Sequence, residues 1–387
     1  MADFPAGLAL SVRVFSAMQL TCSRDSLTAA LSAVSGVVPS RTTKEILKNV
    51  KLQVASNTAT LIGTDSEIGM RCIVPDVTAD SSGEALLPTA RVLSILRELG
   101  DDTVKLEIAG DALWVRGGYS EFRLSAEPAA DFPPVPEFND SAYFALPSSG
   151  LRQLSRRTVF ATDVESTRYA LGGVLMELTP ERATLAATDS RRLAVATSSC
   201  RVEGAPVPPS SPPVVPAKAM SLLERVLTDG DTEARIAIHN NDVVIQAGGI
   251  TVSSQLVQGR FPDYRKVVPS HFNSTIEMVV GPFYSAVRQA QIVTNEESRG
   301  VDFTFAKGVL RLSSQAADVG QSKIELPISY AAADLTITFD PRYIADFLRT
   351  LEGGTQLRFQ LIDHESAAVL MTDDNYTYVI MPLSRDR

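Results

Sequence analysis

The hydrophobic residues of this chain recur with two spacings, one typical of helices and one typical of strands. Residues 24–37 carry Leu27, Leu31 and Val34 at helical spacing, and the segment ends at a Ser-Gly pair and a proline. A second helix is predicted over residues 88–99, which open with a proline and are followed by a glycine. Shorter runs typical of strands lie between and after these helices, at residues 50–54, 59–62, 68–74, 104–108, 112–115 and 121–124.

The same succession of patterns recurs twice more along the chain. Predicted helices lie at residues 147–161, 216–227, 281–294 and 340–351, and predicted strands at 174–178, 183–186, 301–305 and 309–312. The second helices of the three repeats align without gaps, as Leu87–Leu99, Val215–Leu227 and Phe339–Leu351. The dipeptide Thr188-Asp189 also repeats Thr64-Asp65 at an offset of 124 residues, although the third repeat lacks it. These correspondences predict an internal triplication.

Two proline-containing connectors separate the repeats. Phe132-Pro133 ends the first repeat, and Phe261-Pro262, 129 residues further on, lies in a longer connector that runs from Gly259 to Pro269. We therefore place three domains at residues 18–138, 139–265 and 266–387. Residues 1–17 are predicted to be a disordered extension before a natural start near Met18 rather than a signal peptide, because Asp3 replaces the basic first region of such a peptide and Arg13 interrupts the apolar run.

Composition narrows the class of protein. The 387 residues are 44% hydrophobic and 21% charged, which is typical of globular proteins of several domains. A net charge of −9 argues against a generic basic nucleic-acid binder. The three cysteines are far apart and form no Cys-x-x-Cys motif, so neither a disulfide framework nor a zinc site is predicted. A reducing compartment, the cytoplasm, fits this pattern best.

The distribution of charge is more informative than its sum. The six predicted helices hold eleven Lys and Arg against five Asp and Glu, so the acidic residues concentrate elsewhere. Arg97, Arg225 and Arg349 occupy one equivalent position in the second helices, and Lys218 and Arg342 lie two turns earlier. If these residues only solvated ordinary helix surfaces, positive and negative charges would be mixed on helices and strands alike. The alignment favours a basic helical face that meets a polyanion.

No catalytic arrangement emerges from the sequence. The three histidines are scattered, and there is no nucleophile elbow, phosphate-binding loop or dinucleotide-binding motif. Asp65 and Asp189 are the only repeated acids, and we predict that each accepts hydrogen bonds from its own turn rather than binding a metal. Two alternatives stay open at this point, an enzyme acting on nucleotides and a purely structural repeat scaffold. We expect no cofactor and no metal.

Several motifs together resemble one family, the bacterial DNA polymerase III beta subunits, or sliding clamps. The matching stretches run from Met18 to about Leu383, namely Ala187–Ala194, Arg168-Tyr169, Gly172-Gly173, Gly259–Pro269, Thr294–Glu296, Arg299–Val301 and Tyr378–Pro382. The resemblance implies an α+β fold of three repeated DNA-clamp domains, each with two helices packed on antiparallel sheets, in a head-to-tail dimeric ring. It also implies a processivity factor that is not itself catalytic, with duplex DNA, the polymerase alpha subunit, the clamp loader and other clamp-binding proteins as partners.

The resemblance also assigns sites. The residues expected to contact duplex DNA, by this similarity or by their place on the helices, are Arg41, Arg97, Arg152, Arg156, Tyr169, Lys218, Arg225, Arg342 and Arg349. The dimer seam is expected at Phe122, Leu124, Ile292 and Val293. Family partners insert a short peptide, typically glutamine followed by leucine and a hydrophobic pair, into a pocket. The matching positions are Leu171, Thr188, Ser190, Arg191, Arg192, Leu193, Pro262, Lys266, Val267, Tyr343, Val379, Met381, Pro382 and Leu383.

Four positions depart from the usual pattern of the family. Ala170 replaces the second of two adjacent tyrosines, Ser190 and Arg191 replace the commoner Gly-His, and Lys266 replaces arginine. The two substitutions next to each other make the rim of the expected pocket more polar and more basic. We therefore expect this chain to favour peptides that carry an acidic residue beside the hydrophobic pair.

Overall fold

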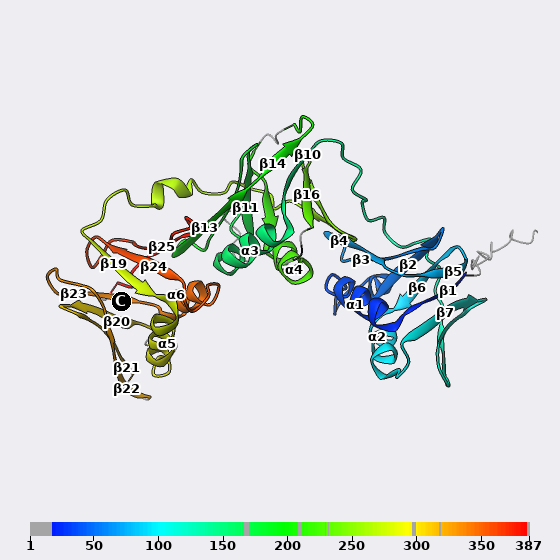
Figure 1. Cartoon of the computed structure of the whole chain (residues 1–387), viewed down its shortest axis with the longest axis horizontal. Coiled ribbons are helices and arrows are strands. Elements are labelled where there is room, and N and C mark those ends of the chain that lie inside the picture. Colours follow the sequence, from blue (N-terminus) through cyan, green and yellow to red (C-terminus); the bar gives the residue numbers. More distant parts are fainter. Residues whose placement is uncertain are drawn as a thin grey trace, which may run out of the picture. The chain divides into compact units, whose positions relative to one another are not determined.

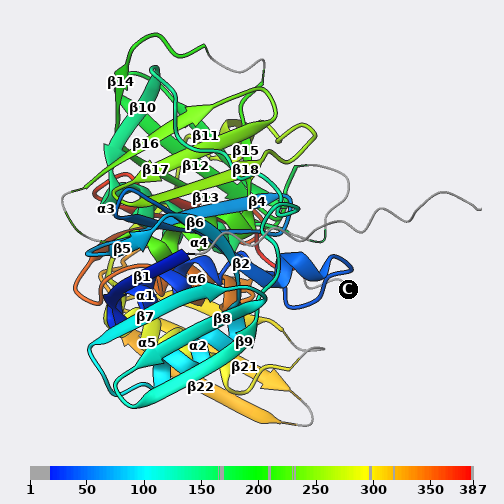
Figure 2. The ribbon, with the colours of Figure 1, turned by 90° about the vertical axis from the view of Figure 1, so that its right-hand side faces the viewer.

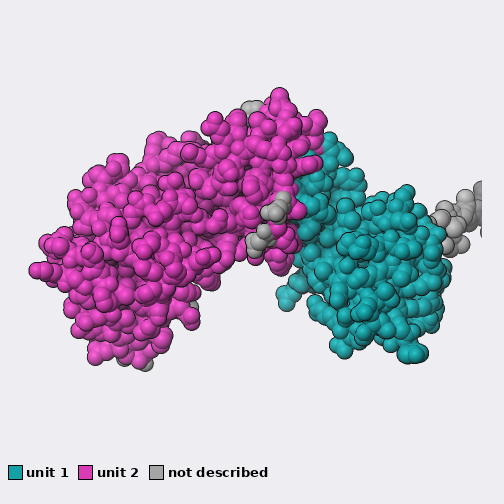
Figure 3. Space-filling model, viewed as in Figure 1, with its two compact units in different colours: residues 1–139, 244–254 teal, residues 140–243, 255–387 magenta. Residues whose placement is uncertain are grey.

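The structure, a computed structural model, describes residues 18–163, 165, 170–207, 211–228, 230, 232–295, 299–316 and 319–384. The chain divides into two compact units, residues 1–139 with 244–254 and residues 140–243 with 255–387 (Figure 3). The predicted extension over residues 1–17 lies outside the described residues. Within the described part of the chain, no helix is long and apolar enough to span a membrane.

Unit 1 contains two helices that contact each other and two antiparallel sheets (Figure 1). The helices are α1 (Arg24–Val34) and α2 (Thr89–Glu98). One sheet, seen in Figure 2, has the order β5 (Thr78–Ser81), β1 (Met18–Ser23), β7 (Thr103–Ala109), β8 (Ala112–Gly117), β9 (Ser120–Ser125). The other runs in the order β18 (Ile250–Gln255), β4 (Ile68–Val74), β3 (Thr58–Thr64), β2 (Asn49–Ala55), β6 (Gly83–Pro88).

The α1 helix packs closely on the second of these sheets at Gly63 of β3. A Cβ atom added to Gly63 would lie 2.6 Å from the Cγ1 atom of Val34 and 3.0 Å from a methyl group of Val37. Any larger residue would therefore push the helix off the strand. The glycine allows the buried face of α1, with Leu27, Leu31 and Val34, to cover the sheet.

Unit 2 repeats this architecture twice. Its helices are α3 (Ser148–Thr158), α4 (Ala217–Val226), α5 (Val280–Gln291) and α6 (Pro341–Leu348). One eight-stranded sheet has the order β15 (Val214–Pro216), β11 (Gly173–Leu178), β12 (Arg182–Thr188), β13 (Arg192–Ser199), β26 (Thr377–Ile380), β25 (Ala368–Thr372), β24 (Gln356–Leu361), β19 (Ser274–Val279). A four-stranded sheet has the order β22 (Gly320–Pro327), β21 (Val309–Ala316), β20 (Val301–Ala306), β23 (Leu335–Phe339). Strands β14 (Arg201–Glu203), β10 (Tyr143–Pro147) and β16 (Glu233–Ile238) pair in that order. The next strand in the chain, β17 (Asp242–Ala247), belongs to unit 1 from Val244 onward.

The eight-stranded sheet joins the second and third repeats. Its central pairing is between β13 and β26, with Leu193 opposite Val379 and Arg192 opposite Ile380. Short 3-10 helices complete the fold at η1 (Glu45–Lys48), η2 (Val159–Ala161) and η3 (Tyr264–Val267). The segment that contains η3 was predicted as a connector because of its prolines. The structure confirms that it is neither a strand nor an α-helix.

All six predicted helices are present, with ends that differ from the prediction by up to three residues. The predicted turns at the repeated Thr-Asp dipeptides are also confirmed. Asp65 accepts hydrogen bonds through Oδ1 from the backbone N–H groups of Glu67 and Ile68, at 2.9 and 2.7 Å. Asp189 does the same for Arg191 and Arg192, at 3.0 Å each. These carboxylates therefore stabilise strand-end turns.

Candidate functional site: a peptide-sized pocket and exposed basic residues on the helices

A cavity of about 340 Å³ opens beside the β13–β26 pairing of unit 2. Its lining comes from the turn between β12 and β13 with the adjoining ends of both strands, from the connector that contains η3, and from β26 and the residue after it. The lining residues are Thr188, Ser190, Arg191, Arg192, Leu193, Pro262, Tyr264, Val267, Val379 and Met381. Leu193 and Val379 are buried, whereas Val267 and Met381 are exposed apolar side chains at 48% and 40% of their surface. The cavity thus combines a buried apolar base with an exposed apolar rim.

Tight hydrogen bonding shapes the turn at one side of this cavity. The Thr188 hydroxyl donates to the carbonyl oxygen of Arg192 at 2.6 Å and accepts from the backbone N–H of Ser190 at 3.1 Å. Ser190 has a φ of +73°, in the left-handed region that favours glycine. Glycine, which we expect to be the commoner residue here by family resemblance, would adopt this conformation without strain. The turn presents Arg191 to solvent next to the cavity.

Arg192 is the buried ionic centre of the site, since its side chain is only 9% exposed. Its guanidinium donates to Asp189 at 2.9 Å, to Asp346 at 2.8 Å and to the carbonyl oxygen of Phe160 at 2.7 Å. It also lies over the ring of Tyr343, 4.4 Å from the ring centroid. One side chain therefore ties the turn before β13 to α6 of the next repeat.

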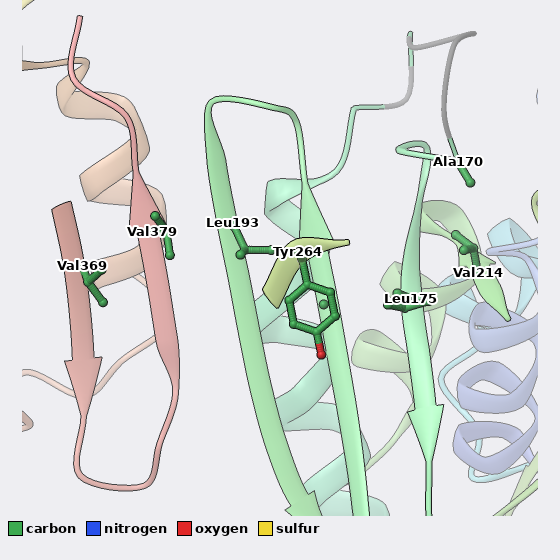
Figure 4. Close-up of a cluster of buried hydrophobic side chains, with 8 residues drawn as sticks. Ala170, Leu175, Leu193, Val214, Tyr264, Val369 and Val379 are labelled. Carbon is green, nitrogen blue, oxygen red and sulfur yellow. The ribbon is translucent and has the colours of Figure 1, made fainter. Parts of the chain in front are cut away.

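Beneath the cavity lies a cluster of buried apolar side chains (Figure 4). Its members are Ala170, Leu175, Ala186, Leu193, Val214, Tyr264, Val369 and Val379. Tyr264 belongs to both the cluster and the cavity lining, and its hydroxyl donates to Oε2 of Glu177 on β11 at 2.8 Å. Burial raises the pKa of the Tyr264 phenol, and the hydrogen bond to Glu177 raises it further. The hydroxyl therefore remains a protonated donor at neutral pH.

The structure brings nine of the fourteen predicted pocket residues together around the cavity. Of the other five, Leu171 is buried, and Lys266 is exposed and pairs with Asp263 at 3.0 Å. Tyr343 stacks with Arg192 without lining the cavity. Pro382 and Leu383 line a separate cavity of about 470 Å³.

Tyr264 is the lining residue that the sequence prediction omitted. Its position inside the connector, between Pro262 and Val267, was the available signal. Both of those neighbours were on the predicted list, and an aromatic side chain between them has the size to reach the same cavity.

The residues predicted to contact DNA lie mainly on exposed helix surfaces. Arg97 of α2, Lys218 and Arg225 of α4, Arg349 at the end of α6 and Arg41 in a loop are all exposed. Tyr169 lies outside the described residues.

Three further predicted residues are engaged by neighbouring groups. Arg342 is held by the buried carboxylate of Asp340 at 2.6 Å. Arg152 and Arg156 of α3 donate to the carbonyl oxygens of Glu224 and Arg349 at 3.1 Å, near the ends of α4 and α6. These two arginines therefore also cap helix termini, in addition to adding positive charge.

The predicted seam residues lie at exposed places in each unit. In unit 1, β9 is the edge strand of its sheet, and Phe122 on it is 36% exposed while Leu124 is partly buried. In unit 2, Ile292 follows α5 and is 76% exposed, and Val293 is partly buried. Exposed apolar side chains on or beside an edge strand are typical of association surfaces.

The sequence matches three successive domains of one family. The matches are to the DNA polymerase III beta subunit N-terminal domain over residues 18–136, its central domain over 145–263 and its C-terminal domain over 265–384. The chain belongs to the DNA polymerase III beta subunit family. The predicted three-domain clamp fold is therefore confirmed, whereas the boundaries after residues 138 and 265 stay predictions.

Relatives and solved structures agree with this assignment. The beta sliding clamp of Escherichia coli (strain K12) is 32% identical over 369 residues, which cover 95% of this chain and all of the relative. That of Pseudomonas aeruginosa is 33% identical over 374 residues, with the same coverage. A crystal structure of the P. aeruginosa clamp bound to griselimycin has a TM-score of 0.85 at 32% identity, and the Bacillus subtilis clamp has 0.86 at 26%. Each structure is matched over its whole length by 95% of this chain.

Proposed function

We propose that this protein is the processivity factor of bacterial DNA replication, a ring of two copies that encircles duplex DNA and tethers DNA-processing proteins. The full-length match to all three domains of the beta subunit family carries this conclusion. The family is non-catalytic, so the protein acts by tethering. A polymerase tied to a ring that stays on the duplex meets the primer end at a high effective concentration and rebinds quickly after each dissociation. We propose the cytoplasm as its location and the domain boundaries given above as its organisation.

The exposed basic residues on the helices are proposed to face the DNA phosphates. Such contacts carry no sequence information and weaken steeply with salt, which suits a ring that must slide. Replacing Arg97, Arg225 and Arg349 together with alanine should reduce clamp-dependent DNA synthesis at moderate salt without changing sequence preference. The matched control removes the same charge from strands, through Arg182, Arg201 and Arg235, which are also exposed. Equal losses in the two triple variants would contradict a DNA face on the helices.

The cavity beside β13 and β26 is proposed to bind the short peptide motif of partner proteins. Its volume of about 340 Å³ is of the size needed for one or two large apolar side chains. Burying each of these would contribute about 1.5–3 kcal/mol, enough for a tether that holds and still exchanges. A labelled peptide Gln-Leu-Ala-Leu-Phe tests the assignment by fluorescence anisotropy. Saturable binding to the wild type that Leu193→Asp abolishes would support this assignment. If the wild type does not bind the peptide, the assignment is wrong.

A further inference from the structure

The connector that forms one wall of the cavity is attached to the sheet of the second repeat at a specific point. Pro262 and Val267 line the cavity, and Tyr264 lies between them in the chain. The hydroxyl of Tyr264 reaches Glu177 on β11, 87 residues away in sequence. Because Glu177 does not line the cavity, this contact holds the wall from outside the proposed binding surface.

Two further interactions involve the ring of Tyr264, and a third involves Glu177. The guanidinium of Arg265 lies over the ring of Tyr264 at 4.7 Å and donates to Glu177 Oε2 at 2.6 Å. Phe261 packs edge-on against the ring at a centroid distance of 6.5 Å. Tyr264 itself is only 6% exposed, whereas the side chain of Arg265 is 63% exposed. The phenol–carboxylate bond is therefore more shielded from solvent than the neighbouring ion pair, although the Glu177 side chain that accepts both is 21% exposed.

We propose that Tyr264 and Glu177 form a positioning pair that fixes the wall of the peptide pocket and keeps it apolar. With its hydroxyl bound to Glu177, Tyr264 offers ring carbon atoms to the cavity, while the hydrogen bond holds Pro262 and Val267 at their places in the wall. This inference rests on the proposed function of the pocket. It adds a specificity-determining pair, one member of which never contacts the peptide.

The two members of the pair are not equivalent when removed. Glu177→Ala leaves the hydroxyl of buried Tyr264 without its acceptor. The hydroxyl then moves to reach another acceptor, and the connector that forms the wall moves with it. Tyr264→Phe removes the hydroxyl as well, so no buried donor is left unpaired, and Glu177 keeps its ion pair with Arg265. We therefore expect the alanine variant to bind peptide less well than the phenylalanine variant.

The test is a double-mutant cycle on the affinity for the labelled peptide Gln-Leu-Ala-Leu-Phe. We expect Glu177→Ala to weaken binding about tenfold, or ~1.4 kcal/mol, and Tyr264→Phe by about threefold. The double variant should bind no worse than Glu177→Ala alone, because the hydroxyl that lost its acceptor is gone. Glu177→Gln keeps an acceptor oxygen and should restore most of the affinity.

Two control variants distinguish an effect of this pair on peptide affinity from a general loss of stability. Tyr330 is also buried, at 7% exposure, and donates its hydroxyl to the Ala333 carbonyl at 2.6 Å, but it does not line the cavity. Tyr330→Phe should leave peptide affinity unchanged. Arg265→Ala removes the exposed ion pair and the contact of its guanidinium with the Tyr264 ring, but it leaves the Tyr264 hydroxyl its acceptor, so it should cost less than Glu177→Ala.

A second readout is the choice between a leucine and an asparagine of similar size in the peptide. Glu177→Ala should reduce the preference for Gln-Leu-Ala-Leu-Phe over Gln-Leu-Ala-Asn-Phe, because the released hydroxyl can then satisfy a polar side chain. Additive losses in the cycle, or an unchanged preference, would overturn the positioning role. Absence of wild-type binding would instead remove the pocket assignment, so the two failures can be told apart.

Discussion

Arg192 offers the sharpest test of how the second and third repeats are joined at the pocket. Replacing it with alanine removes three hydrogen bonds of 2.7–2.9 Å and the contact with the Tyr343 ring. It also takes their shared cation from the carboxylates of Asp189 and Asp346, although Asp346 keeps an ion pair with Arg349 at 3.2 Å. Their side chains are 14% and 30% exposed, so Asp189 in particular cannot recover full hydration.

The magnitude follows from this burial. Removing one partner of a buried ion pair costs about 3–5 kcal/mol. Asp346 lies at the exposed end of the network, regains water and keeps Arg349 as a partner, which lowers the expected loss for Arg192→Ala to about 2–4 kcal/mol. The control is Arg201→Ala, which also breaks ion pairs with two carboxylates, those of Glu203 and Glu233. Unlike Arg192, however, the Arg201 side chain is 52% exposed. An exposed pair contributes about 0–1 kcal/mol.

Urea denaturation followed by far-UV circular dichroism measures the loss. Trp114 is the single tryptophan of the chain and lies in β8 of unit 1, so its fluorescence reports that unit separately. We expect Arg192→Ala to shift the dichroism transition far more than the fluorescence transition. If it is no more destabilising than Arg201→Ala, the network does not join the repeats as described.

Three further predictions concern the ring, the rim and pH. Ile292→Ala combined with Val293→Ala should give a folded monomer, and a stable dimer in light scattering would place the seam elsewhere. Arg191→Ala should remove the preference for the labelled peptide Gln-Leu-Asp-Leu-Phe over its alanine counterpart, and equal affinities of both peptides for both proteins would refute a basic rim. Hydrogen bonds to Asp242 and to Asp140 raise the pKa of His239 above its ordinary 6.5. The stability that His239 contributes should therefore be fully present below that pH and lost as pH rises through the raised pKa. Melting curves of wild type and His239→Gln that differ equally at acidic and alkaline pH would contradict this.

Helices were predictable because their burial is one-sided. In α4, for example, Met220 and Leu223 are buried while Lys218 and Arg225 are exposed, and this contrast is visible in the spacing of residue types. Among the strands that the prediction omitted, β13 lacks such contrast. In β13, small residues such as Ala194 are buried, and alternation is weak because the strand lies in the middle of a sheet.

The pocket could be predicted only in part, because its walls come from distant parts of the chain. Position-by-position similarity assigned Leu193 and Val379, which face each other across β13 and β26. The tie between Arg192 and Asp346 spans 154 residues, and no local pattern indicates it. Tyr264 was missed although it lies in the chain between two assigned residues, Pro262 and Val267, because position-by-position similarity did not assign it.

The most direct test of the whole account is whether this protein is held on DNA by topology. Purified protein is loaded by a clamp loader onto a nicked circular duplex and then passed through a sizing column at a salt concentration that abolishes simple phosphate binding. A ring of two copies should remain with the circle and should be lost once the same DNA is linearised. Equal retention on circular and linear DNA, or loss from both, would contradict an encircling clamp.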